Sequence, residues 1–250
     1  MINLDRSVER WNNISGSARQ LGIELTRIPA IDGVAVPPAE WQGFDLPAFR
    51  RANGREALSG EYGCYRSHVA ALQQFLNDGS TSAVILEDDA VLNGKLPPCL
   101  LALEARFADR AVLVRLVVHR MTGFEQLESI PVNASGSLQL GQCWFGPNGS
   151  AAAYWLTRAA AENLIKAALP GRMPFDMVLE RPWEHHTPSL MFRPSILEIP
   201  KPLFSEIGST RVPGAINKYQ WYKRSGALLF RSVQLVRRLV HSAKQRRLPG

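Results

Sequence analysis

A short apolar run that ends in three consecutive acids constrains this chain more than any other feature. Residues 83–90 read Ala-Val-Ile-Leu-Glu-Asp-Asp-Ala. Such a run is typical of a strand covered on both faces of an α/β sheet, and ligands in these sheets bind beyond the carboxyl ends of the strands. Crowded carboxylates repel one another unless a cation or donor groups compensate. Glu87, Asp88 and Asp89 therefore predict a site for Mg²⁺ or Mn²⁺ with a diphosphate, and the alternative is a solvated acidic turn.

Strand and helix signals alternate along the chain. A short strand at residues 2–4 precedes a helix to about Leu21, and residues 24–31 alternate as a second strand. Residues 34–58, rich in proline and glycine, predict a long loop beside a site. The pattern further predicts helices at 60–77, 100–107 and 157–169, a buried strand at 111–118, and weaker strands within 121–149 and 172–210. This order predicts an α/β fold with a mixed, mainly parallel sheet flanked by helices.

The net charge of +7 is unevenly distributed. Beyond Glu206 the sequence has no acid and ten basic residues: Arg211, Lys218, Lys223, Arg224, Arg231, Arg237, Arg238, Lys244, Arg246 and Arg247. Residues 1–206 thus hold 19 basic and 22 acidic side chains. We therefore expect a mildly acidic catalytic domain over residues 1–210 and a basic C-terminal extension over residues 211–250.

Apolar residues at helical spacing run through this extension. Leu229, Val233, Val236 and Val240 follow one another at steps of four, three and four, which predicts an amphipathic helix. A basic helix of this kind can lie in an anionic membrane surface, where each cation contributes about 1 kcal/mol. The alternative is a helix docked on the domain with a solvated basic edge. We expect no nucleic-acid partner, because no aromatic residues that could stack on bases are interleaved with the cations.

The cysteines and the start of the chain bear on its compartment. Cys64, Cys99 and Cys143 are too few for a disulfide framework and odd in number. Residues 1–6 lack the order of a secretory signal, and no apolar stretch is long enough to span a bilayer. These observations predict a cytoplasmic protein.

Six short motifs follow one another in a recognisable order. They are Ile2-Asn3-Leu4-Asp5-Arg6-Ser7, Ile28-Pro29-Ala30-Ile31-Asp32-Gly33, Gly60-Glu61-Tyr62-Gly63-Cys64-Tyr65-Arg66-Ser67-His68, Ile85-Leu86-Glu87-Asp88-Asp89, Ala153-Tyr154-Trp155-Leu156-Thr157 and Pro174-Phe175-Asp176. Together they resemble glycosyltransferase family 25, which includes the lipooligosaccharide galactosyltransferases of bacteria and the collagen galactosyltransferases. The pairing of Gly-Glu-x-Gly-Cys-x-x-Ser-His with Leu-Glu-Asp-Asp is specific, whereas either half alone is weak.

The resemblance implies a GT-A-type, Rossmann-like fold and a nucleotide-sugar donor, usually UDP-galactose. It also implies inverting transfer to a sugar hydroxyl, here of the lipooligosaccharide or lipopolysaccharide core. A divalent cation, Mn²⁺ or Mg²⁺, would neutralise the diphosphate that leaves. By similarity to the acidic motif of GT-A enzymes, Asp89 is the first metal ligand. Asp88 or Glu87 would bind the ribose or provide a second metal ligand.

Other residues are expected to bind the donor. Asn3, Arg6 and Asp32 lie at or near the ends of the first two strands, where a nucleotide would rest. Arg6 or Arg10 would contact uridine or phosphate, and an exposed position on the first helix is the alternative. Ser67 and His68 are expected to contact the donor or to pack within their helix.

The acceptor hydroxyl needs a general base. Asp176 is the preferred base, and capping of the following helix is its alternative role. Glu184 is the reserve base, and a solvated surface acid is its alternative.

Two other functional classes use some of these features. A metal-dependent phosphotransferase or nucleotidyltransferase also has clustered acids beside a strand, but is expected to carry a Walker-type loop or a second acidic pair. A non-catalytic membrane-binding protein accounts for the basic extension but not for the motifs. We therefore expect a peripheral glycosyltransferase on the inner face of the inner membrane, held by its basic helix near a lipid-anchored lipooligosaccharide acceptor.

Overall fold

A six-stranded sheet forms the centre of the computed structural model, which describes residues 1–133, 136–199 and 218–245. The strand order is β3-β7-β4-β8-β6-β5. The bounds are β3 Ser82–Leu86, β4 Leu113–Arg115, β5 Phe124–Asn133, β6 Gly136–Cys143, β7 Ala153–Thr157 and β8 Ser189–Arg193. The mixed α/β class is thus confirmed.

The predicted mainly parallel character is wrong. β4 and β8 pair in parallel, whereas β3–β7, β4–β7, β6–β8 and β5–β6 pair antiparallel. β7 enters between β3 and β4 against the direction of both, and β5 with β6 forms a hairpin. An apolar run indicates that a strand is buried on both faces, but it carries no information about the direction of its neighbours.

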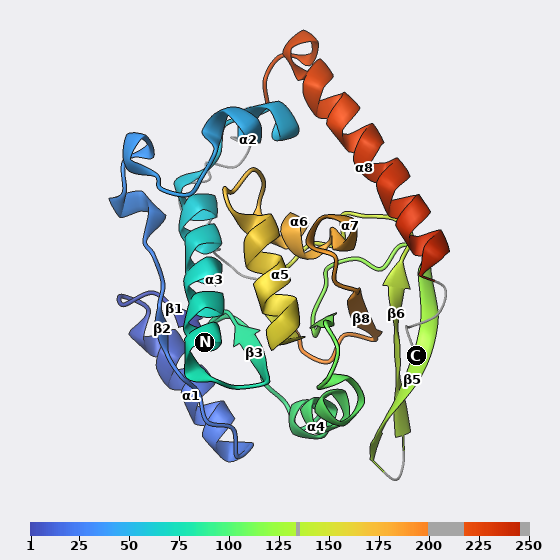
Figure 1. Cartoon of the computed structure of the whole chain (residues 1–250). Coiled ribbons are helices and arrows are strands. Elements are labelled where there is room, and N and C mark those ends of the chain that lie inside the picture. The colour runs from blue at the N-terminus through green and yellow to red at the C-terminus, as the bar shows by residue number, and fades with distance from the viewer. Residues whose placement is uncertain (134–135, 200–217, 246–250) are drawn as a thin grey trace.

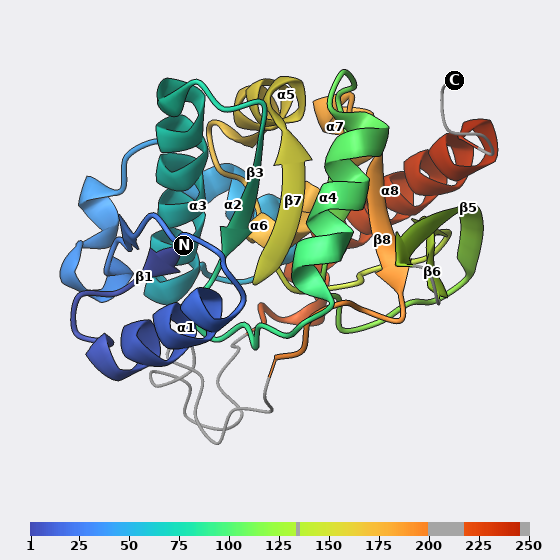
Figure 2. The ribbon, with the colours of Figure 1, turned by 90° about the horizontal axis from the view of Figure 1, so that it is seen from below.

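Helices cover both faces of the sheet, as Figure 2 shows. One face packs against α3 (Ser59–Asp78), α5 (Arg158–Ala168) and α6 (Phe175–Leu179). The other packs against α1 (Val8–Gln20) and α4 (Leu96–Phe107). Adjacent residues of one strand enter opposite cores: Trp155 joins the α4 core, and Tyr154 and Leu156 join the α3 core. This alternation is the two-sided burial that the apolar strands predict.

A small parallel sheet joins the start of the chain to the acidic strand end. It consists of β1 (Ile2–Asn3) and β2 (Ile28–Pro29). An isolated parallel bridge pairs Ile2 with Glu87, directly after β3. The predicted second strand thus shrinks to two residues, and the first motif lies beside the acids.

The predicted loop at residues 34–58 is partly helical. It holds 3₁₀ turns at Gly33–Ala35 and Pro38–Glu40, followed by α2 (Leu46–Asn53). Asp45 caps α2 by accepting a hydrogen bond from the Ala48 N–H, and Gly54 ends it at φ 64°. The sequence prediction missed this capping pair because prolines and glycines surround it.

The C-terminal helix α8 (Ser225–Lys244) follows a 3₁₀ turn at Trp221–Arg224 and runs alongside α2, α6 and α7 (Pro182–His185) in Figure 1. The face that contacts the domain is mixed: Ala227 is buried, Phe230 lies against Arg181, Gln234 accepts a hydrogen bond from Trp183, and Arg238 binds Glu180. Its apolar face is outward, with Val236 60% exposed. The helix is therefore docked through a mixed face, with several of its other apolar residues in solvent.

The predicted domain boundary at residue 210 lies outside the described residues. Among the described helices, none is both long and apolar enough to cross a bilayer.

Candidate functional site

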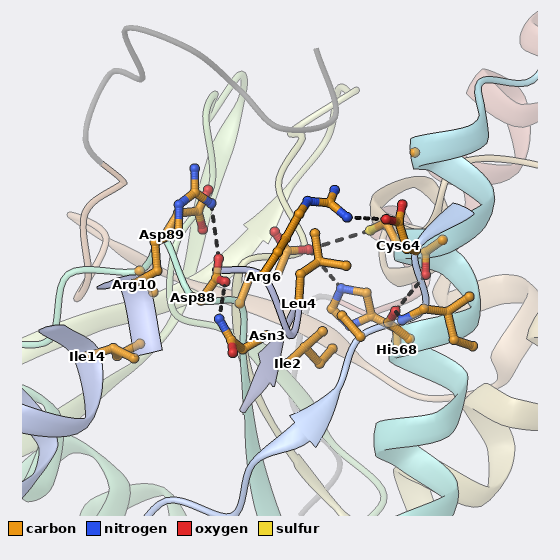
Figure 3. A pocket seen from close by; sticks show the side chains of 18 of the residues that line it. Ile2, Asn3, Leu4, Arg6, Arg10, Ile14, Cys64, His68, Asp88 and Asp89 are labelled. Atoms are coloured by element: carbon orange, nitrogen blue, oxygen red, sulfur yellow. Dashed lines mark hydrogen bonds and ion pairs between the residues drawn. The ribbon is translucent and has the colours of Figure 1, made fainter. Parts of the chain in front are cut away.

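A cavity of about 600 Å³ opens where the end of β3 meets β1, α1 and α3 (Figure 3). This volume lies within the range of small-molecule sites. All the residues predicted to bind donor or metal line it: Asn3, Arg6, Arg10, Asp32, Ser67, His68, Glu87, Asp88 and Asp89. The structure therefore brings together segments that are far apart in the sequence.

Glu87 points to α3. Its Oε1 lies 2.8 Å from Nε2 of His68 and 3.6 Å from Sγ of Cys64. Nδ1 of His68 lies 3.0 Å from the hydroxyl of Tyr154. Burial raises the pKa of Glu87, but the hydrogen bonds and charge of its partners outweigh burial and leave this pKa below its ordinary value. An ionised Glu87 accepts a hydrogen bond from Nε2 of His68, and Nδ1 shares a hydrogen bond with the Tyr154 hydroxyl.

Asp88 points the opposite way, to the start of the chain. Its Oδ2 accepts a hydrogen bond of 2.7 Å from Nδ2 of Asn3, and its Oδ1 accepts one of 3.1 Å from Arg10. Asn3 is 1% exposed, and its Oδ1 also accepts from Arg27. Asp88 therefore ties β1 and α1 to the end of β3, as Figure 3 shows.

Asp89 is the least compensated of the three acids. Among the described residues, its buried Oδ1 has no hydrogen-bond partner, although the charge of Arg10 and a backbone hydrogen bond favour the ionised carboxylate. Burial, together with the charges of Glu87 and Asp88, raises the pKa of Asp89 to about 6. A buried carboxylate oxygen of this kind is costly unless a cation or donor reaches it. Of the three acids, Asp89 best fits a cation from the cavity side.

A glycine contact places the second motif against α3. A Cβ on Gly33 would lie 1.8 Å from the backbone oxygen of Ser59, and one on Gly63 would lie 2.5 Å from that of Ile31. The Ser67 hydroxyl accepts from the Ile31 N–H at 2.8 Å and donates to the Gly63 carbonyl at 2.7 Å. Ser67 thus lines the cavity while fastening this loop.

Asp32, on the same loop, forms an ion pair with Arg6 at the cavity mouth. The Arg6 side chain is 54% exposed and that of Asp32 is 34% exposed. Solvent screens such a pair, so it stabilises the fold by less than about 1 kcal/mol. A bound phosphate can therefore compete for Arg6 at little cost.

Asp176 lies behind this cavity and does not line it. It sits in the first turn of α6, where Oδ1 accepts from the Met177 N–H at 2.8 Å, and the helix cap is Pro174. Burial, followed by the charge of Glu180, raises its pKa. The neighbouring Phe175 ring stacks on His68 with centroids 4.4 Å apart. Asp176 is thus a partly buried acid close to the cavity wall, and it does not cap the helix.

Glu184 lies elsewhere, on α7. Its Oε1 pairs with Arg181 at 3.2 Å and with Arg237 of α8 at 2.5 Å. It lines a second cavity, between α8 and the domain. The structure does not bring Glu184 to the predicted donor site.

Sequence reasoning missed a buried ion network beside Asp176. Arg115 and the Glu180 side chain are 1% and 2% exposed, and their charged groups approach to 3.4 Å. Arg115 donates to the Gly149 carbonyl and, at 2.5 Å, to that of Ser150. Glu180 accepts from two backbone N–H groups and from Arg238 at 2.9 Å. The sequence signal that could have revealed this network is Arg115, a single arginine inside the apolar run 111–118.

Two sets of residues could hold a metal ion. Asp89, with Asp88, offers carboxylate oxygens that suit Mg²⁺ or Mn²⁺. Among the described residues, Cys64, His68 and Glu87 form a second set, with ligand atoms within 4.8 Å of one another. These S, N and O atoms suit a softer ion, but they already bind one another.

Comparisons with known proteins agree on one family. The family model described as Glycosyltransferase family 25 (LPS biosynthesis protein) matches residues 1–179. A Glycosyltransferase 25 family member of Aedes aegypti is 28% identical over 93 residues. Procollagen galactosyltransferase 2 of Mus musculus is 27% identical over 93 residues. These matches cover 36% of this chain and only 15% of the length of each relative.

Proposed function

Because the chain belongs to glycosyltransferase family 25, we propose that it transfers galactose from UDP-galactose to a sugar hydroxyl of the lipooligosaccharide or lipopolysaccharide core. We further propose that the transfer inverts the configuration at the anomeric carbon and is assisted by Mn²⁺ or Mg²⁺. A procollagen galactosyltransferase among its relatives supports the choice of sugar.

One observation carries the proposal: the uncompensated Oδ1 of Asp89 in a cavity lined by the family motifs. Asp89 would hold the cation, Asp88 would assist it, and donor phosphate oxygens would complete the coordination. The bound ion would neutralise the charge that develops on UDP. The acids at the end of β3 are also the support for a GT-A-type assignment.

The remaining cavity residues would bind the nucleotide. Arg6 is exposed at the mouth and is assigned to the diphosphate, where a guanidinium can make two parallel hydrogen bonds. Asp32 would then turn to the ribose. Asn3, Arg10 and His68 would also position two of the acids, because each binds Asp88 or Glu87.

Asp176 is our proposed general base. Its raised pKa keeps the carboxylate basic enough to accept the acceptor proton near neutral pH. Its charge, after burial and Glu87, also raises the pKa of the Cys64 thiol in the cavity wall. The acceptor would therefore enter from the α6 side, and Glu184 is not proposed as a base.

The acceptor gives the C-terminal helix a role. A lipid-anchored acceptor places the reaction at a membrane, so we propose a cytoplasmic enzyme bound to the inner face of the inner membrane. The outward apolar face of α8 supports this location, and the exposed Arg231 and Lys244 flank that face.

A donor assay tests the proposal. UDP-galactose binding and hydrolysis are measured with Mn²⁺ and with EDTA, for the wild type, Asp89→Asn and Asp109→Asn. Asp109 is an exposed acid on another part of the surface and serves as the matched control. We expect Mn²⁺-dependent turnover that Asp89→Asn lowers by about a hundredfold or more and Asp109→Asn leaves unchanged. Absence of donor binding under both conditions would sink the proposal.

A further inference from the structure

A second cavity, of about 680 Å³, lies between α8 and the domain. Residues of α2, α7, the segment before α6 and α8 line it. Figure 1 shows α8 running past these elements. The family motifs that line the donor cavity do not account for this space.

Arginines dominate the polar lining. Arg51, Arg172, Arg181 and Arg237 face a single carboxylate, that of Glu184. Arg181 and Arg237 both bind the same oxygen of Glu184. Within the described residues, Arg51 and Arg172 are exposed and make no ion pair. The cavity therefore carries an excess of positive charge that its own residues do not neutralise.

Arg181 shows that this charge is not relieved by solvent. Its side chain is 6% exposed, and in the described part of the chain its buried Nε has no hydrogen-bond partner. Burial lowers the pKa of Arg181 to about 10, although Glu184 opposes the shift. Guanidinium groups gathered in one cavity are the expected partners of an anion with several acceptor oxygens.

Most of the remaining lining is apolar. Val178 and Met173 come from the domain, and Leu229, Phe230 and Val233 come from α8. Leu229 is 68% exposed and Val233 is 41% exposed. These two residues thus connect the arginines inside the cavity to the apolar face of α8 outside it.

We propose that this cavity binds the phosphate of an anionic lipid, whose acyl chain leaves along Leu229 and Val233. Phosphate oxygens match the guanidinium donors, and the apolar rim matches the chain. A second copy docking through its own extension fits less well, because the described part of the extension has no acid to meet these cations and like charges would be opposed. The inference extends the proposed membrane contact to a defined lipid site and does not depend on sugar transfer.

Soluble short-chain lipids test the site without a membrane. Binding of dihexanoylphosphatidic acid, dihexanoylphosphatidylcholine and inorganic phosphate to the full chain is measured by calorimetry. We expect phosphatidic acid to bind at least about tenfold more tightly than either of the others, since only it offers both charge and chain. Equal affinity for phosphatidylcholine would overturn the role of the arginines, and equal affinity for inorganic phosphate would overturn the role of the chain.

Matched variants locate the binding. The double variant Arg51→Gln/Arg172→Gln removes two exposed cations of the cavity and leaves the buried Arg181 in place. We expect about tenfold weaker binding of phosphatidic acid. Arg231→Gln removes an exposed cation of α8 that does not line the cavity, and should leave binding unchanged. An equal loss in both variants would indicate general attraction to the basic helix and overturn the site.

Failure of the lipid site can be distinguished from failure of the sugar-transfer proposal. UDP-galactose turnover with a soluble acceptor is measured for the same double variant, which leaves the donor cavity intact. Lost lipid binding with normal turnover supports both proposals. A wild type that binds phosphatidic acid but no UDP-sugar would contradict only the proposed function.

Discussion

At the scale of single residues, the three neighbouring acids at the end of β3 lie in three different environments. Glu87 turns to His68 of α3, Asp88 turns to Asn3 and Arg10, and Asp89 has a buried oxygen that no described residue contacts through a hydrogen bond. Two of the acids thereby hold elements together, and the third is the acid that we propose binds the cation. Separate substitutions should separate these roles.

Asp89→Asn should stabilise the metal-free protein while abolishing metal-dependent turnover. The pKa of Asp89 rises from 3.8 to about 6, mainly through burial. The folded protein therefore binds a proton more tightly than the unfolded chain does, and between these pKa values the wild type loses at most about 3 kcal/mol as pH rises. An asparagine side chain does not titrate, so the variant does not lose stability in this way. Urea unfolding in EDTA should show the variant to be more stable near neutral pH and the difference to vanish near pH 4.

Asp88→Asn is the matched control, with the opposite expected sign. The carboxylate of Asp88 accepts hydrogen bonds from Asn3 and Arg10, and an amide cannot replace both. We expect the free energy of unfolding to fall by about 1–2 kcal/mol. If both variants lose stability, Asp89 is not the uncompensated acid.

Tyr154→Phe tests the other side of the acidic turn. Tyr154 is fully buried, and its hydroxyl is the partner of Nδ1 of His68. Its removal leaves a buried nitrogen unpaired, so we expect a loss of about 1–2 kcal/mol in urea unfolding. Tyr222→Phe, at a 56% exposed tyrosine, should change stability by less than about 0.5 kcal/mol. Equal effects would contradict the hydrogen-bonded chain from Tyr154 to Glu87.

At the scale of elements, the sequence predicts what local patterns encode. The helix expected at 60–77 spans Ser59–Asp78, because its apolar spacing and Gly79 are local signals. The sequence predicted that the three acids lie together at the end of β3, but not that their side chains point in different directions. Their partners lie 85 residues away for Asn3 and 19 residues away for His68, which only the folded chain reveals. The prediction of strand direction was wrong for the same reason, because neighbouring strands come from distant parts of the sequence.

The docking of α8 is an element-scale property that Arg238→Met should weaken. Glu180 is nearly inaccessible and loses one of its two arginine partners in this variant. An under-compensated buried carboxylate should lower the free energy of unfolding by about 2–4 kcal/mol. We also expect faster proteolysis within α8. Arg231→Met, at an exposed position on the same helix, should show neither effect.

At the scale of the whole molecule, α8 presents an apolar surface that no described residue covers. Leu228, Leu235 and Val236 are 54%, 45% and 60% exposed. Deleting the helix would also remove the Glu180 partner Arg238, so substitution is the cleaner test of membrane contact.

Changing Leu228, Leu235 and Val236 to serine should reduce flotation with anionic vesicles by at least about tenfold, because each side chain loses apolar area to bury. Thermal stability should be unchanged, since all three side chains face solvent. Leu101→Ser, at a 74% exposed leucine on α4, is the matched control and should float normally. Normal flotation of the triple variant would contradict membrane contact through this face.

The pairing of Glu180 with Arg238 also determines when the domain can complete its packing during synthesis. The two residues are 58 positions apart, so a ribosome adding about 5–20 residues each second delivers the arginine roughly 3–12 seconds after the glutamate. During that interval the core around Asp176 contains a carboxylate with one arginine instead of two. The nascent domain therefore reaches its final packing only after α8 has been synthesised, and a chaperone has its clearest opportunity to bind during this delay.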